Sequence, residues 1–371
     1  MILLSTIIQR FEAELLAQYQ DRLLPSHLKA LAAMAVCRTS ASPSMLAQCT
    51  ECDHQVLVPH SCGHRSCPHC QHHESQQWLE RQLNKLVPGQ YFLVTFTLPA
   101  AFRTLAFAHQ STLYDRMIQC AWQCIQSFAH NDRQLQGTPG AIAVLHTHAR
   151  CLDFHPHVHL VVPAAAIDAK KRLWRTKRSK GKKRYLFNHK ALAKVFRAKL
   201  LAAITGAGLP LPARYPQKWV VDCKCVGSGE KALVYLGRYL YRGVIREQDI
   251  LACANGEVTF RYKEGESGRT KKRTVSGAKF LWLILQHVLP KGFRRARNFG
   301  FLHPNSKRLI GVLQFLFGLD PKRGLAFLKS RPQIQCPCCG APMTIIRTRL
   351  LPVLPASPPV PLGETAGAGV M

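Results

Sequence analysis

The sequence predicts an α+β protein in which a small cysteine- and histidine-rich unit precedes a larger domain of antiparallel strands and helices. Two runs rich in β-branched residues, 142–148 and 157–162, are separated by a connection of hairpin length, so they are expected to pair antiparallel. Stretches with helical apolar spacing lie before and after these runs, and two C-x-x-C pairs occur between residues 49 and 70. The chain of 371 residues is long enough for two or three domains.

The individual elements are predicted from the spacing of apolar residues along the chain. Apolar residues recur at helical intervals from Ile7 to Tyr19, and Pro25 starts a second helix that covers 28–36. Aromatic and β-branched residues at 91–98 predict a strand that ends at Pro99. By the same criteria, further helices are expected at 78–86, 100–128, 189–203, 231–242, 280–288 and 309–317, and further strands at 219–226, 257–262 and 269–275.

The charge of the chain indicates its partners. Lys and Arg number 51 against 20 Asp and Glu, which gives a formal net charge of +31 and favours nucleic acid as the ligand. No window approaches the ~20 apolar residues of a membrane helix, and residues 1–8 read as the first turns of a helix rather than a signal peptide. We therefore expect a cytoplasmic, nucleoid-associated protein without membrane partners, in which the 15 cysteines stay reduced.

The run 155–162 (HPHVHLVV) carries the clearest chemical signal in the chain. Successive side chains of a strand point to opposite faces, so His157 and His159 share one face while the apolar residues beside them share the other. One face can then pack on a core while the other holds a metal ion. His146, on the neighbouring strand, is the preferred third ligand and His148 the second choice. Imidazoles suit Mn better than Mg, yet a phosphate and water can supply oxygens to Mg²⁺ or Mn²⁺, so the identity of the metal stays open.

Two tyrosines occupy one face of the predicted helix 231–242. Tyr235 and Tyr239 are spaced i and i+4, Arg242 continues their face and Arg238 lies beside it. A phenol oxygen can attack a phosphate, and arginines can stabilise the phosphate charge. An aromatic stripe taken alone is more often core packing, but the histidine strand and the positive charge favour catalysis here.

The paired cysteines predict a structural zinc site. Cys49, Cys52, Cys67 and Cys70 form two C-x-x-C pairs whose spacing is typical of tetrahedral zinc, and Cys62 is a surplus ligand that could replace one of them or join a histidine in a second site. A later cluster, CPCCG at 336–340, has no matching second pair nearby, and its metal binding stays open.

Basic residues interleaved with aromatic ones predict contacts with DNA. The segment 170–185 combines cations for phosphates with Trp174 and Tyr185, which can stack on bases of a single strand. Smaller basic clusters occur at 271–273 and 294–297. The residues expected to contact DNA are Arg238, Arg242, Lys177, Arg178, Lys182, Lys183 and Arg184.

From about residue 5 to 345 the chain resembles the rolling-circle transposases of the insertion-sequence-91 type, within the HUH endonuclease class. The resemblance is carried by the runs 35–39 (AVCRT), 61–71 (SCGHRSCPHCQ), 94–99 (VTFTLP), 144–147 (VLHT), 155–159 (HPHVH), 235–239 (YLGRY), 287–293 (HVLPKGF) and 298–302 (NFGFL). It implies a palm-like antiparallel sheet with flanking helices, His157 and His159 as metal ligands with a third ligand from elsewhere, and Tyr235 and Tyr239 as nucleophiles.

These observations predict a DNA transposase that nicks and rejoins single strands at mobile-element ends through a 5′-phosphotyrosine intermediate. The expected cofactors are catalytic Mg²⁺ or Mn²⁺ and structural Zn²⁺, and the expected partner is single-stranded or hairpin DNA, with homo-oligomerisation left open. The alternatives are a plasmid replication initiator or relaxase of the same chemistry, and a non-catalytic zinc-dependent nucleic-acid-binding protein. The predicted division is into N-terminal helices (1–40), a zinc-binding domain (41–87), the catalytic domain (88–302), a helical region with the late cysteines (303–350) and a disordered tail (351–371).

Overall fold

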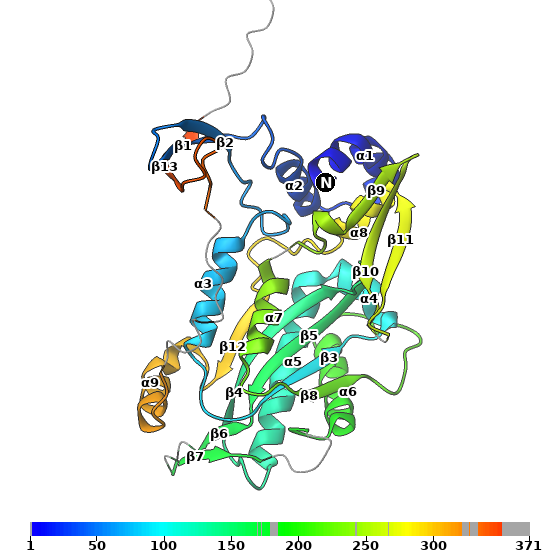
Figure 1. The fold of residues 1–371 in the computed structure, drawn as a ribbon. Helices are drawn as coiled ribbons and strands as arrows, with labels where there is room; N and C mark the ends of the chain where they lie inside the picture. The colour runs from blue at the N-terminus through cyan, green and yellow to red at the C-terminus, as the bar shows by residue number, and fades with distance from the viewer. Residues whose placement is uncertain are drawn as a thin grey trace, which may run out of the picture. The chain divides into compact units, whose positions relative to one another are not determined.

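The computed structural model describes residues 2–168, 170–171, 173–178, 185–241, 243–265, 267–320, 326 and 333–350, with the backbone alone at 238 and 239. The chain forms two compact units, the first made of Met1–Ala35 and Cys62–Arg331 and the second of Val36–Ser61 and Pro332–Met371 (Figure 1). Three sets of expectations lie outside the described residues: the tail 351–371, the contacts at Lys182, Lys183 and Arg184, and the contact at Arg242. No helix among the described residues is long and apolar enough to cross a membrane.

A seven-stranded sheet forms the centre of the first unit, and all of its strand pairs are antiparallel. The order is β7-β6-β4-β5-β3-β8, and β12 also pairs with β4. This sheet and its helices confirm the predicted α+β class. The strands are β3 (Tyr91–Thr97), β4 (Thr138–His148), β5 (Phe154–Pro163), β6 (Ala165–Asp168), β7 (Leu173–Thr176), β8 (Val221–Cys225) and β12 (Ala296–Gly300).

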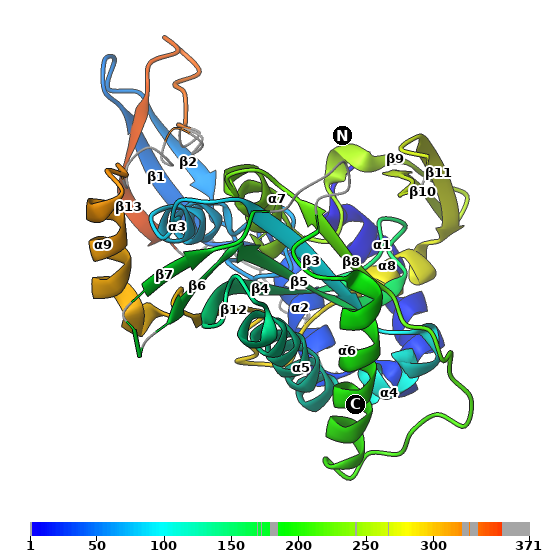
Figure 2. The ribbon, with the colours of Figure 1, turned by 90° about the horizontal axis from the view of Figure 1, so that it is seen from below.

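One face of this sheet is covered by α5 (Gln110–Asn131) and α6 (His189–Thr205), as Figure 2 shows. Val158, Leu160 and Val162 of β5 point into this layer and are buried with α5 and α6 side chains in one apolar cluster. The predicted helix 100–128 is divided in the structure into η2 (Ala100–Phe102), α4 (Arg103–Ala108) and α5.

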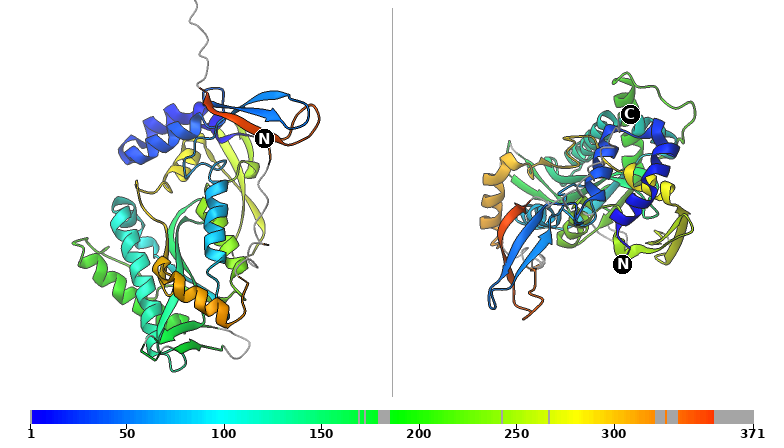
Figure 3. Two further views of the ribbon diagram at one scale, coloured as in Figure 1. Left: turned by 90° about the vertical axis from the view of Figure 1, so that its left-hand side faces the viewer. Right: turned by 90° about the horizontal axis from the view of Figure 1, so that it is seen from above.

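The opposite face is covered by α3 (His72–Leu83) and α7 (Glu230–Tyr241), which pack against each other (Figures 2 and 3). Val161 of β5 belongs to this second apolar layer together with Leu233 and Leu236 of α7. The turn that leads into α7 requires glycine at 229, because the φ of Gly229 is +97° and a Cβ at this position would lie 2.8 Å from the Tyr91 ring. The residues of β5 that alternate with Val158, Leu160 and Val162 therefore lie on the face of the sheet that α7 covers.

Two smaller groups of elements complete the first unit. The N-terminal hairpin of α1 (Leu4–Tyr19) and α2 (Pro25–Ala35), joined by η1 (Gln20–Arg22), packs on α8 (Gly277–Leu285). A Cβ at Gly277 would lie 2.2 Å from the Phe11 ring, so this contact requires glycine. A three-stranded sheet contains β9 (Ile250–Ala254), β10 (Glu257–Lys263) and β11 (Thr270–Ser276), so the expected hairpin is present with an unpredicted third strand. The remaining elements are η3 (Glu247–Asp249), η4 (Pro304–Ser306) and α9 (Lys307–Leu316).

The second unit contains a three-stranded antiparallel sheet whose strands come from distant parts of the chain. Its order is β13-β1-β2, with β1 (Ser44–Cys49), β2 (Gln55–Pro59) and β13 (Met343–Leu350). This arrangement differs from the predicted division, in which 41–87 is one domain and 303–350 a separate helical region. The prediction differs because β1 pairs with β13, and local sequence patterns do not predict a pairing between such distant segments.

Candidate active site

The hairpin of β4 and β5 positions a group of histidines on the α7 face of the central sheet. His146 of β4 is the cross-strand partner of His157 in β5, and His159 follows two residues later on the same face. One ring nitrogen from each of the three lies within 4.8 Å of those of the others. His146 and His159 are buried, at 5% and 7% exposure. Imidazole nitrogens gathered in this way fit a divalent metal ion.

Hydrogen bonds made by the Nδ1 atoms orient two of these rings. His157 Nδ1 lies 2.7 Å from the carbonyl oxygen of His155, which can only accept, so this nitrogen carries the proton and Nε2 keeps a lone pair. His159 Nδ1 lies 2.8 Å from Thr95 Oγ1 on β3, and the hydroxyl can accept in the same way. Metal-binding histidines are usually held by such outer contacts.

The histidines of this group are neutral near pH 7. Burial lowers the pKa of His157 to about 4 and that of His159 to about 3. Burial also lowers the pKa of His146 well below its usual range, and the neighbouring imidazoles add to the effect. A neutral imidazole has the lone pair that a metal ion needs.

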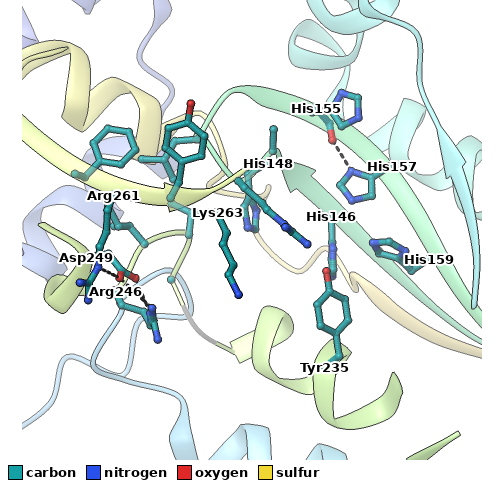
Figure 4. Close-up of a pocket in the computed structure, with 18 of the residues that line it drawn as sticks. His146, His148, His155, His157, His159, Tyr235, Arg246, Asp249, Arg261 and Lys263 are labelled. Atoms are coloured by element: carbon teal, nitrogen blue, oxygen red, sulfur yellow. Dashed lines mark hydrogen bonds and ion pairs between the residues drawn. The ribbon is translucent and has the colours of Figure 1, made fainter. Parts of the chain in front are cut away.

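Helix α7 brings one predicted tyrosine to this group. The ring of Tyr235 meets that of His159 edge to face, with 6.4 Å between centroids, and its hydroxyl points toward the histidines (Figure 4). Tyr239 and Arg238 lie further along α7, but their side chains are outside the described residues. His148 lines the same cavity, and its ring stacks at 6.2 Å from His146 and meets His287 at 5.5 Å.

The histidines and Tyr235 line a cavity of about 610 Å³ whose other wall is basic. Asp249 bridges Arg246, at 2.6 Å, and Arg261, at 2.9 Å. Lys263 points toward the cavity (Figure 4) and has no ion-pair partner within the described part of the chain. The sequence analysis missed these cations, although the i, i+2 spacing of Arg261 and Lys263 on β10 is a signal for one strand face.

A second cavity of the first unit, here called the basic groove, has a volume of about 1360 Å³ and lies along α3, β12 and α9. None of its described lining residues is acidic. Arg65 is engaged by the carbonyl oxygens of Leu289, Pro290 and Phe293. The other cations that line it are Arg81, Lys85, Arg294, Arg295, Arg297 and Lys307.

Two of the basic residues predicted to bind DNA are described outside these cavities. Lys177 forms an ion pair with Asp132 and lies 5.2 Å from the centroid of the Phe187 ring, so its charge is balanced within the protein. Arg178 is exposed.

The cysteines gather differently from the four-ligand set that the sequence predicts. In the second unit, Cys49 and Cys52 lie with Cys336 and Cys339, and their four sulfur atoms are within 4.8 Å of one another. In the first unit, Cys67 and Cys70 lie with Cys62, and the sulfurs of Cys62 and Cys70 are 3.6 Å apart. The predicted set is therefore divided, because β13 brings the late cysteines to the end of β1.

Comparison with known proteins gives matches along most of the chain. Residues 7–98 match the "Transposase zinc-binding domain" family and residues 140–309 the "Putative transposase" family. The "Putative transposase y4qJ" of Sinorhizobium fredii (strain NBRC 101917 / NGR234) is 31% identical over 322 residues, which cover 80% of this chain and 79% of that protein. The "Transposase for insertion sequence element IS801" of Pseudomonas savastanoi pv. phaseolicola is 29% identical over 328 residues, covering 79% and 76%.

Solved structures add little to these matches. The conjugative relaxase TrwC in complex with OriT DNA, in its metal-free structure, shares 13% identity with a TM-score of 0.25, over 62% of this chain and 72% of that one. A second TrwC complex, with mutant OriT DNA, gives the same TM-score and identity over 61% and 74%. A superposition this loose supports no conclusion about fold or chemistry.

The sequence matches and the α+β architecture together define a DNA transposase. The chain belongs to the insertion-sequence-91 type, with an N-terminal zinc-binding domain, which confirms the resemblance seen in the sequence.

Proposed function

We propose that this transposase nicks and rejoins single-stranded DNA at the ends of its mobile element through a covalent 5′-phosphotyrosine. The observation that carries the proposal is the position of Tyr235, whose ring meets that of His159 in the cavity that all three grouped histidines line. A nucleophilic hydroxyl and a metal-binding group beside one cavity are what phosphodiester cleavage through a protein–DNA bond needs.

The residues present fit a divalent metal ion. His146, His157 and His159 would hold Mg²⁺ or Mn²⁺, with oxygens of the phosphate and of water completing the coordination. When bound, such an ion withdraws electron density from the scissile phosphate. His157 Nδ1 donates to the His155 carbonyl oxygen, and His159 Nδ1 can donate to the Thr95 hydroxyl. These contacts fix the rings so that Nε2 of each is available as a ligand.

Tyr235 is the proposed nucleophile. Its phenol oxygen loses its proton to solvent and bonds to phosphorus, while the bond from phosphorus to the 3′ oxygen breaks. The released 3′ oxygen gains a proton and becomes a free hydroxyl, and the 5′ end stays attached to the protein. Attack of a 3′ hydroxyl on the phosphotyrosine reverses these bond changes and rejoins a strand.

Tyr239 is the proposed second nucleophile, because it follows Tyr235 by one turn of α7. A second tyrosine would allow the protein to hold one DNA end while a second strand is cut. Arg238 and Arg242 are proposed to contact phosphates near these tyrosines, on the basis of their spacing alone.

Positive charge around both cavities supports DNA as the substrate. Lys263 and the pair of Arg246 and Arg261 face the histidines across the cavity, where phosphates of a single strand would lie. The basic groove is large and free of acidic lining among its described residues, and we assign it to the backbone of the hairpin part of an element end. The segment around Lys177, Arg178, Lys182, Lys183 and Arg184 is a further proposed contact, in which Lys177 would exchange its ion pair with Asp132 for a phosphate.

The test uses labelled single-stranded element ends incubated with the full-length protein and Mn²⁺ or Mg²⁺. The expected product is a covalent protein–DNA band that requires the metal and disappears in the double variant Tyr235→Phe/Tyr239→Phe, while DNA binding survives. Tyr19→Phe is the matched control, because it also removes only a hydroxyl. Tyr19 lies in the N-terminal hairpin, where its ring stacks on Trp282 of α8 at 5.0 Å. A covalent band that persists in the double variant would refute the tyrosine assignment. Binding without any metal-dependent band from the native protein would favour a non-catalytic binding protein.

A further inference from the structure

The late cysteines form a compact turn next to the end of strand β1 in the second unit. The Cys336 amide donates to the carbonyl oxygen of Ala341 at 2.8 Å, and the Gly340 amide donates to that of Cys336 at 2.9 Å. Gly340 has a φ of +73°, which the turn needs and which glycine adopts without strain. This turn leads into β13, whose Met343 is the partner of Cys49 in β1.

A second turn presents the other two thiols. Cys49 ends β1, and the amide of Glu51 donates to its sulfur at 3.4 Å. Cys52 follows within the same turn, which continues through Asp53, a residue with a φ of +54°. Two C-x-x-C turns that face each other are the usual frame of a tetrahedral zinc site.

The distances between the sulfur atoms match such a site. Cys49 and Cys339 are 3.5 Å apart, Cys52 and Cys336 are 3.6 Å apart, and Cys52 and Cys339 are 3.5 Å apart. Four sulfurs at ~2.3 Å from a tetrahedral zinc ion would be separated by about 3.8 Å. A disulfide would instead require about 2.05 Å between two of them.

The second unit has few apolar contacts, so a metal ion could contribute much of the stability of its fold. Among its described residues the buried apolar cluster contains Ala47, Cys49, Cys336 and Met343, and two of these are the thiols themselves. Only partly buried apolar residues pack against it, namely Val56, Val58, Ile334 and Ala341. A unit of this size without a metal or disulfide buries too little apolar surface to be stable.

We propose that Cys49, Cys52, Cys336 and Cys339 hold a structural zinc ion that joins the N-terminal hairpin of the second unit to its C-terminal strand. The family matches cover residues 7–98 and 140–309, so they include the first two ligands and neither of the last two. The zinc site of the second unit is therefore completed from outside the matched zinc-binding domain. The proposal does not depend on the tyrosine chemistry.

Cys338 provides a matched control inside the same turn. It lies between two proposed ligands and is exposed, yet it does not belong to the group of four. Cys52 and Cys339 are also exposed, so exposure alone predicts equal reactivity for all three thiols. A bound zinc ion predicts that Cys338 reacts alone.

The first experiment measures metal content in the purified full-length protein. Cys336→Ser and Cys339→Ser are each expected to contain one zinc ion per chain less than the native protein, while Cys338→Ser retains the native content. Equal zinc content in all four proteins, or an equal loss in Cys338→Ser, would overturn the proposal.

The second experiment uses the native chain, so it does not depend on whether a variant folds. A thiol-alkylating reagent is applied before and after removal of zinc with a chelator, and modified cysteines are located by mass spectrometry. Cys338 is expected to react first, and Cys52 and Cys339 at least tenfold more slowly until zinc is removed. Equal rates for the three thiols in the zinc-loaded protein would show that no metal is bound there.

Discussion

Replacing Thr95 with valine tests how the histidine group is oriented. Thr95 on β3 is the cross-strand partner of His159, and its hydroxyl lies 2.8 Å from Nδ1 of that ring. Valine keeps the shape and the strand preference of threonine but removes the acceptor. A buried ring N–H without a partner costs about 1–3 kcal/mol, and loss of such an orienting contact weakens metal binding by about 10–100-fold, or about 1.4–2.8 kcal/mol.

The assay is a titration of Mn²⁺ into the zinc-loaded protein, read as a dissociation constant by calorimetry. Thr95→Val is expected to raise that constant by about 10–100-fold, while the thermal midpoint of unfolding falls by only a few degrees. Thr274→Val is the matched control, since its hydroxyl lies 2.8 Å from that of Thr259 on the exposed face of another sheet. A dissociation constant within about twofold of the native value would mean that Thr95 does not orient a metal-binding ring.

Two further predictions concern pH and salt. His27 is fully buried, and burial lowers its pKa to about 4. Between about pH 6.5 and pH 4 the imidazole is therefore protonated in the unfolded chain but not in the folded chain. The free energy of unfolding is expected to fall by about 1.4 kcal/mol for each pH unit in this range as the pH is lowered. Urea unfolding of His27→Leu should lack this part of the slope, and parallel slopes would contradict it. The double variant Arg81→Gln/Lys85→Gln should make the negative slope of log affinity for hairpin DNA against log salt concentration less steep by about 2. An unchanged slope would show that the basic groove does not contact the DNA.

Local alternation and spacing were enough to predict the parts of the site that lie on one hairpin. The period of two in β5 places its apolar residues toward α5 and α6 and His157 and His159 on the other face, because adjacent strand residues cannot share a face. The tyrosine helix was also predictable, since Gly227 and Gly229 precede an uninterrupted helical pattern.

The parts that could not be predicted depend on contacts between distant segments. The partner of a C-x-x-C pair is decided by which strands meet, and Cys49 meets Cys339 only because β13 pairs with β1. The cations Arg246 and Lys263 reach the histidine cavity through the loop after α7 and through β10, and their spacing from the histidines in the sequence carries no distance information. Side-chain partners such as Thr95 follow from strand register, which a single sequence does not define.

The pairing of β1 with β13 also determines when, during synthesis, the sheet of the second unit can form. Cys49 is made 290 residues before Cys339, an interval of about 15–60 s at ribosomal rates of roughly 5–20 residues per second. Throughout this time the hairpin of β1 and β2 has an unpaired edge, although the seven-stranded sheet is complete once β12 has emerged at Gly300. A gene copy with a late premature stop would therefore yield a chain with its histidines and tyrosines in place and an open strand edge. Such a product is expected to associate with other chains through that edge, so its abundance in the cell would be limited by aggregation and proteolysis.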